Sequence, residues 1–140
     1  MTRPQSHRML IRNRAMESQQ IASKRGYDFH RRIYSQNADF DMNATPDASP
    51  DYSFVVRDLL YGRVFSFPDI LDDKETGFVI VAALIGLDCQ YQLKNQMKGM
   101  MYNGTSRKEV IWLRDLCRDV AQQLDVKFRF GPPDEIPSIE

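Results

Sequence analysis

An unbroken run of eleven non-polar residues, 77–87, constrains the fold of this 140-residue chain more than any other feature. The run is longer than an ordinary strand and shorter than the about 20 residues that a membrane span needs. Its Ala82, Ala83 and Leu84 favour a helix. We therefore expect a central helix over residues 72–87 that neighbouring helices cover on all sides.

The remaining periodic apolar segments and helix caps predict an all-α chain, a compact bundle of about five to six helices without a sheet. Ser106 and Glu109 form a capping box that starts the last of these helices. Gly26 marks either the middle of one long first helix or a break in it. The expected helices cover residues 13–35, 51–65, 72–87, 89–103 and 106–124.

Around these helices we expect a single helical domain over residues 13–125. A basic arm, residues 1–12, precedes it. The tail, residues 126–140, contains three prolines and is expected to be extended.

The last helix carries two apolar faces. One is a stripe that we expect to pack into the core: Val110, Leu113, Cys117, Val120 and Leu124. Apolar residues off that stripe are Ile111, Trp112 and Leu116. A second apolar face on a terminal helix indicates a partner subunit, so we expect a homo-oligomer, either a dimer or a ring.

Composition and charge narrow the function classes. Nineteen basic side chains balance nineteen acidic ones, which argues against a nucleic-acid partner. No phosphate-binding loop and no nucleophile elbow occur, so phosphoryl transfer and serine hydrolysis lack support. Clusters of thiolate or imidazole ligands are absent as well, and we predict neither a metal nor a cofactor.

The expected compartment follows from the cysteines and the first residues. Cys89 and Cys117 follow no secretory segment, which favours a reducing, cytoplasmic location. The first sixteen residues hold four arginines and no acid, and a mitochondrial presequence is therefore the alternative.

Cys89, Gln92 and Gln96 are the residues with the most suggestive spacing. At intervals of three and seven positions they share one face of a helix. Together with the preceding apolar run, residues 81–109 (VAALIGLDCQYQLKNQMKGMMYNGTSRKE) resemble the carboxymuconolactone decarboxylase and alkyl hydroperoxidase D superfamily, and are most similar to its decarboxylase branch. The resemblance is strongest over residues 71–116, and it implies all-helical, ring-forming proteins.

The sequence departs from the motifs of that superfamily at two positions. Where the peroxidase branch has CxxCxxxH, this chain has Cys89, Gln92 and Gln96. A single sulfur cannot form a local disulfide, so thiol peroxidase activity is disfavoured. A glutamine has no proton to exchange near pH 7, and proton transfer would fall to other groups.

The resemblance implies a cofactor-free enzyme that performs lyase or isomerase chemistry on a small oxygenated organic acid or lactone. In that hypothesis Gln96 orients the substrate, and Cys89, Tyr61 or His30 exchanges the proton. The residues that would bind the substrate are Gln92, Arg63 and Lys98. Tyr61 and Arg63 lie in a YGRVFSFP segment similar to one that closes over the family's cavity. The alternative is that both are purely structural, with Tyr61 as an aromatic anchor and Arg63 as a surface arginine.

The alternative is a non-catalytic oligomeric helper or structural subunit that kept the fold and lost the catalytic histidine and CxxC. Two glutamines at the motif positions favour this alternative. A closed interior around Gln96 would distinguish it from the enzyme.

Overall fold

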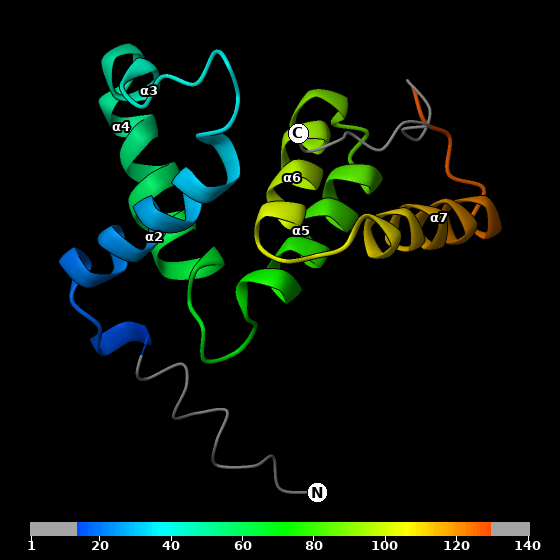
Figure 1. The fold of residues 1–140 in the computed structure, drawn as a ribbon, viewed down its shortest axis with the longest axis horizontal. Coiled ribbons are helices and arrows are strands. Elements are labelled where there is room, and N and C mark those ends of the chain that lie inside the picture. Colours follow the sequence, from blue (N-terminus) through cyan, green and yellow to red (C-terminus); the bar gives the residue numbers. More distant parts are fainter. Residues whose placement is uncertain (1–13, 130–140) are drawn as a thin grey trace, which may run out of the picture. The chain divides into compact units, whose positions relative to one another are not determined.

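The described part of the chain, residues 14–129 of the computed structural model, is helical and contains no strand (Figure 1). The predicted all-α class is therefore confirmed. The helices are α2 (Gln19–Tyr34), α3 (Ala44–Ala48), α4 (Pro50–Ser53), the π-helix η1 (Phe54–Phe65), α5 (Asp73–Gly86), α6 (Gln90–Tyr102) and α7 (Arg107–Gln123). The predicted arm, residues 1–12, and most of the predicted tail lie outside the described residues.

The chain divides into two compact units that are interleaved in sequence. Within the described residues, unit 1 comprises residues 14–31 and Asn37–Asp73, and unit 2 comprises Arg32–Gln36 and residues 74–129. Helix α2 contributes to both, because its last three residues belong to unit 2.

In unit 1, α2 crosses η1 with the two backbones in contact. A Cβ atom added to Gly26 would lie 2.4 Å from the backbone nitrogen of Gly62. A Cβ atom added to Gly62 would lie 2.8 Å from the carbonyl oxygen of Ala22. The helix does not break at Gly26, since α2 continues through it. Glycine is required here for close approach of two backbones.

The segment expected as one α-helix over 51–65 has two parts. It begins with the single turn α4, whose N-cap Ser49 accepts a hydrogen bond from the Tyr52 N–H and precedes a proline at the first helical position. It continues as the π-helix η1. Its hydrogen bonds span five residues, as in the 3.0 Å bond that the Ser66 N–H donates to the Tyr61 carbonyl.

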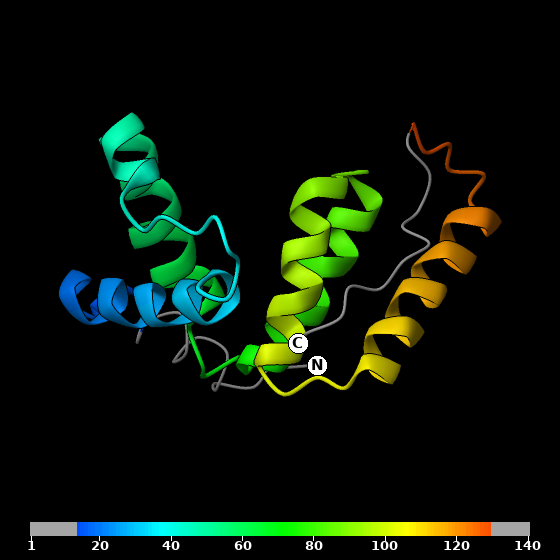
Figure 2. The same cartoon turned by 45° about the horizontal axis from the view of Figure 1, so that its top comes forward.

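In unit 2, α5 and α6 lie side by side in both views (Figures 1 and 2). They bury a cluster together with the N-terminal half of α7: Val81, Ile85, Leu93, Met97, Met100, Met101, Val110 and Leu113. Gly77 makes room for Met100, whose Cγ would lie 2.9 Å from a Cβ at position 77. The methionines therefore fill the core of this unit.

Two expectations about apolar helices are wrong in detail. Helix α5 is not covered on all sides, because Val79 is 57% exposed and Ala83 is exposed as well. On α7 the expected core stripe is buried only at its start, and Val120 and Leu124 are exposed. A uniformly apolar sequence cannot show which side of a helix its neighbours leave open.

The start of α7 agrees with the expected cap. Ser106 accepts a hydrogen bond from the Glu109 N–H, and the Glu109 side chain accepts one from the Ser106 N–H. Lys74 adds an ion pair with Glu109 at 2.7 Å, which links the start of α5 to the start of α7.

Candidate functional site

The amide of Gln96 is buried in unit 2 and hydrogen-bonded to another helix. Only 6% of the residue is exposed. Its Nε2 donates to the Tyr34 hydroxyl at 2.8 Å, and that hydroxyl donates to Oε1 of Gln92 at 3.2 Å. The two glutamines expected to hold a substrate are therefore joined through a tyrosine of α2.

Neighbouring contacts show what this arrangement does. Ile33 packs so closely on Gly99 that a Cβ at position 99 would lie 2.7 Å from the isoleucine side chain. Arg32 Nε donates to Oδ1 of Asn103 at 3.1 Å. Three residues of α6 and its C-cap Asn103 thus contact the last turn of α2; the three are Gln92, Gln96 and Gly99. Together these contacts hold α6 against the last turn of α2, within unit 2.

Two further candidates, Cys89 and Lys98, also lie in unit 2, and the contacts described above include neither of them. Cys89 is exposed at the N-cap of α6, and its side chain makes no capping hydrogen bond. Lys98 is half-buried on α6.

His30 and Tyr61 form a second pair, in unit 1. Their ring centroids lie 4.8 Å apart with the planes nearly perpendicular, a favourable edge-to-face geometry. Burial, with a smaller contribution from the Arg57 charge, lowers the pKa of His30 to about 4. The imidazole is therefore neutral at pH 7. Tyr61 is buried and also packs against Phe29, so it serves as an aromatic anchor.

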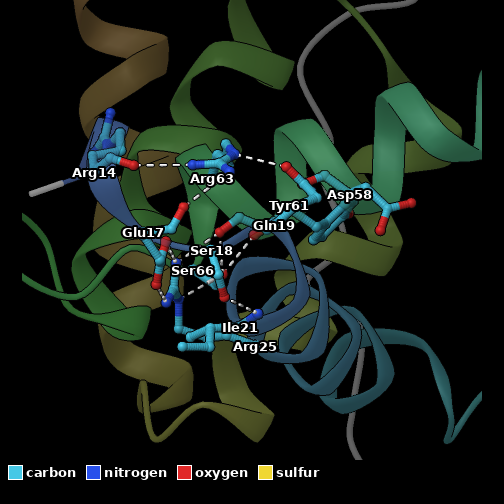
Figure 3. Close-up of polar contacts among 11 residues, drawn as sticks. Arg14, Glu17, Ser18, Gln19, Ile21, Arg25, Asp58, Tyr61, Arg63 and Ser66 are labelled. Atoms are coloured by element: carbon cyan, nitrogen blue, oxygen red, sulfur yellow. Dashed lines mark hydrogen bonds and ion pairs between the residues drawn. The ribbon is translucent and has the colours of Figure 1, made fainter.

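Arg63 belongs to a hydrogen-bonded network around the start of α2 and the end of η1 (Figure 3). Its Nε donates to Gln19 Oε1 at 2.8 Å. Its two remaining nitrogens donate to the carbonyl oxygens of Arg14 and Glu17 at 3.0 and 3.2 Å. All three nitrogens of this guanidinium are used in fixing the chain before α2.

Sequence reasoning missed the centre of this network, the ion pair of Arg25 with Glu17. Arg25 also donates to the Gly62 carbonyl at 2.8 Å and to the Ser66 hydroxyl at 3.2 Å. Its hydrogen bond holds the pKa of Glu17 below the usual range, although burial acts in the opposite direction. Glu17 and Arg25 are eight residues apart, whereas ion pairs on a helix surface join residues three or four positions apart. Their spacing therefore does not identify the pair.

The seven candidates therefore fall into two separate groups. His30, Tyr61 and Arg63 lie in unit 1, and Gln92, Gln96, Cys89 and Lys98 lie in unit 2. In unit 1, the rings of His30 and Tyr61 contact each other. In unit 2, the hydroxyl of Tyr34 links the amides of Gln92 and Gln96.

A cavity of about 310 Å³ lies elsewhere in unit 2, at the C-terminal end of α7. The candidates named above do not line it; its walls are Arg118, Gln122, Asp125, Val126, Lys127 and Phe128. Across residues 14–129, no group of three or more histidine, cysteine, aspartate or glutamate side chains is placed to hold a metal ion. Within the same range no helix has the length and apolar character that crossing a membrane requires.

Two curated proteins are similar to this chain over most of its length. Peroxisomal protein 2 of Schizosaccharomyces pombe is 25% identical over 116 residues, which cover 83% of this chain and 54% of that protein. Peroxisomal protein 2 of Saccharomyces cerevisiae is 29% identical over 99 residues, 71% of this chain and 35% of that protein. The chain thus spans about half of the first relative and about a third of the second.

No family model matches the chain. No solved structure matches it either.

These findings correct the family resemblance. The predicted membership in the carboxymuconolactone decarboxylase and alkyl hydroperoxidase D superfamily is wrong, since the relatives carry a different name and no family model matches. The predicted decarboxylase-like lyase chemistry is wrong on the same grounds. The residues that carried the resemblance lie in the interior of a helix and at a helix end. Helix packing favours small apolar residues and helix termination favours Asn-Gly in unrelated proteins too.

Proposed function

We propose that this chain is a non-catalytic structural part of a peroxisomal protein. The observation that carries the proposal is its similarity, over 83% and 71% of its length, to two relatives named as peroxisomal proteins. The peroxisome takes the place of the cytoplasmic or mitochondrial location expected from the sequence.

The placement of the amide side chains supports the non-catalytic part of the proposal. Gln96 is almost completely buried and donates its hydrogen bond to Tyr34. A group that orients a substrate keeps hydrogen-bonding capacity directed into a cavity, whereas a structural group directs it to the protein. We therefore assign Gln96 to holding α6 against α2.

The location is tested by fractionating cells that express the protein from its own gene, with an antibody raised against this chain. We expect it to sediment with a peroxisomal matrix marker and to coincide with that marker in fluorescence microscopy. Recovery with cytosolic or mitochondrial markers would contradict the proposal.

One catalytic alternative, a thiol peroxidase, is tested on Cys89, the exposed thiol. Because no second thiol is present at position 92, a sulfenic acid formed on Cys89 cannot be resolved locally. We expect the purified chain, supplied with dithiothreitol, to consume hydrogen peroxide no faster than its Cys89→Ser variant. Sustained consumption that this substitution abolishes would show a thiol peroxidase instead.

A further inference from the structure

The connection between α6 and α7 contains Asn103 followed by Gly104, the one Asn-Gly pair in the chain. Each of the other four asparagines precedes arginine, alanine or glutamine. Asparagine loses its amide fastest before glycine, because a following residue without a side chain does not obstruct closure of a succinimide ring. The sequence therefore singles out this turn as chemically reactive.

We propose that Asn103 is a site of spontaneous deamidation, controlled by opening of the turn between α6 and α7. The backbone nitrogen of Gly104 attacks Cγ of Asn103, and Nδ2 takes the proton of that nitrogen and leaves as ammonia. The resulting succinimide adds one molecule of water. Opening at one of its carbonyls gives aspartate, and opening at the other gives isoaspartate, in which the backbone runs through the side chain. No oxidant or reductant takes part.

The attacking residue lies at the surface. Gly104 is exposed, and a Cβ atom added to it would meet nothing within 4 Å. Its φ of 91° belongs to the left-handed region in which helices commonly end. No side chain therefore packs over the nitrogen that would close the ring.

The closed turn restrains the reaction. The Gly104 N–H donates to the Met101 carbonyl at 3.1 Å, and the Thr105 N–H donates to the Met100 carbonyl at 3.0 Å. The ψ angle of Asn103 is 16°, and ring closure needs a rotation about this bond that turns the Gly104 nitrogen toward the side chain. This rotation breaks the hydrogen bond of Gly104, so the turn has to open first.

The side-chain amide of Asn103 is bonded at one end. Its Oδ1 accepts from Arg32 Nε at 3.1 Å, whereas Nδ2 is buried and no acceptor within residues 14–129 reaches it. A buried donor without an acceptor raises the free energy of the closed turn, and water satisfies that donor when the turn opens. The turn is therefore easier to open than its hydrogen bonds alone indicate.

The two products differ in their effect on the end of α6. Aspartate keeps the length of the backbone and offers Arg32 a carboxylate in place of the amide oxygen. Isoaspartate adds a carbon atom to the backbone, so the bond from the Thr105 N–H to the Met100 carbonyl cannot keep its geometry. Deamidation therefore loosens the connection from α6 to α7 through its isoaspartate product.

The first test incubates the full chain at mildly alkaline pH, folded and in denaturing urea, and locates deamidation by mass spectrometry of peptides. We expect reaction at Asn103, slower in the folded chain by roughly 5- to 30-fold, the equivalent of one to two hydrogen bonds. Asn37, Asn43 and Asn95 are controls in the same samples and should keep their amides. An isoaspartate-specific methyltransferase identifies the second product. Equal rates in the two states, or earlier reaction at another asparagine, would overturn the proposal.

The second test concerns the restraint on the side chain. Arg32→Ala removes the hydrogen bond to Oδ1, and we expect the folded variant to deamidate roughly 2- to 10-fold faster than the parent. Arg31→Ala, a matched change at an exposed arginine of the same helix, should react like the parent. In urea all three chains should react alike, and circular dichroism verifies the helices. A folded Arg32→Ala chain that reacts no faster would contradict control by the turn.

The third test compares the deamidated chain, isolated by ion exchange, with Asn103→Asp. Both carry the same charge, and only the deamidated chain contains the lengthened backbone. We expect the deamidated chain to unfold at lower urea concentration, and equal midpoints would contradict the effect assigned to isoaspartate. None of these measurements concerns the compartment or the absence of catalysis, so either proposal can fail without the other.

Discussion

At the scale of single residues, Gln96 donates a partly buried hydrogen bond to the hydroxyl of Tyr34. Replacing Gln96 with alanine removes the donor and leaves a cavity beside the tyrosine hydroxyl. We expect a loss of about 1–3 kcal/mol in the free energy of unfolding, measured by urea titration followed by circular dichroism. Gln92→Ala is the matched control, because Gln92 is exposed; it should cost less than about 0.5 kcal/mol. Equal losses for the two variants would contradict the assignment.

His30 makes the stability of the fold depend on pH. Burial lowers its pKa to about 4 in the folded chain, from the ordinary value of 6.5. Between these values the unfolded chain binds more protons, so stability is lost as pH falls below 6.5. From pH 6.5 to pH 5 we expect His30 to account for a loss of about 1–2 kcal/mol.

The control for this effect is His30→Phe, which keeps an aromatic ring beside Tyr61 and removes the titrating group. Urea titrations at both pH values should show a smaller difference for the variant than for the parent. Carboxylates that titrate in the same range contribute to both proteins and cancel in the comparison. An unchanged difference would show that the histidine is not held neutral by the fold.

At the scale of elements, the crossing of α2 over η1 depends on glycine. An added Cβ at Gly26 would overlap the backbone of η1, which cannot rotate away as a side chain can. We expect Gly26→Ala to destabilise the chain by about 1–3 kcal/mol in thermal or urea unfolding. Gly86→Ala, where an added Cβ meets nothing within 4 Å, should instead stabilise α5 by up to about 1 kcal/mol. A change of stability in the same direction in both variants would contradict this explanation.

The same elements show which parts of the fold the sequence could predict. The start of α7 was predictable, because Ser106 and Glu109 form their capping box within four residues. The π-helical geometry of η1 was not, since its residues carry no local signal that separates five-residue from four-residue hydrogen bonding.

The candidate site was less predictable than the helices. The shared helix face of Gln92 and Gln96 followed from their spacing, whereas their partner Tyr34 is 62 residues from Gln96 in sequence. Contacts between residues so far apart in sequence depend on how the helices pack, and hydrophobic periodicity contains no information about that packing.

At the scale of the whole molecule, two compact units suggest two unfolding transitions. Trp112, the single tryptophan, lies in unit 2, whereas far-ultraviolet circular dichroism reports helices of both units. We expect the urea midpoints from fluorescence and from circular dichroism to differ. In Gly26→Ala, the change in unit 1 should shift the circular dichroism curve more than the fluorescence curve. Coincident curves for both proteins would show a single cooperative unit.

The division of α2 between the units has a consequence for how a gene of this kind can be rearranged. Residues 32–36 of unit 2 lie within the sequence of unit 1, so no single cut separates two complete parts. A recombination event near residue 74 would deliver α5, α6 and α7 without Tyr34, the hydrogen-bond partner of Gln96. Such a fragment would lose this hydrogen bond to Gln96 and would leave Gly99 without the isoleucine side chain that packs on it. We therefore expect the two units to be inherited together, because a transferred unit 2 that begins at Lys74 would lack the residues of α2 that contact α6.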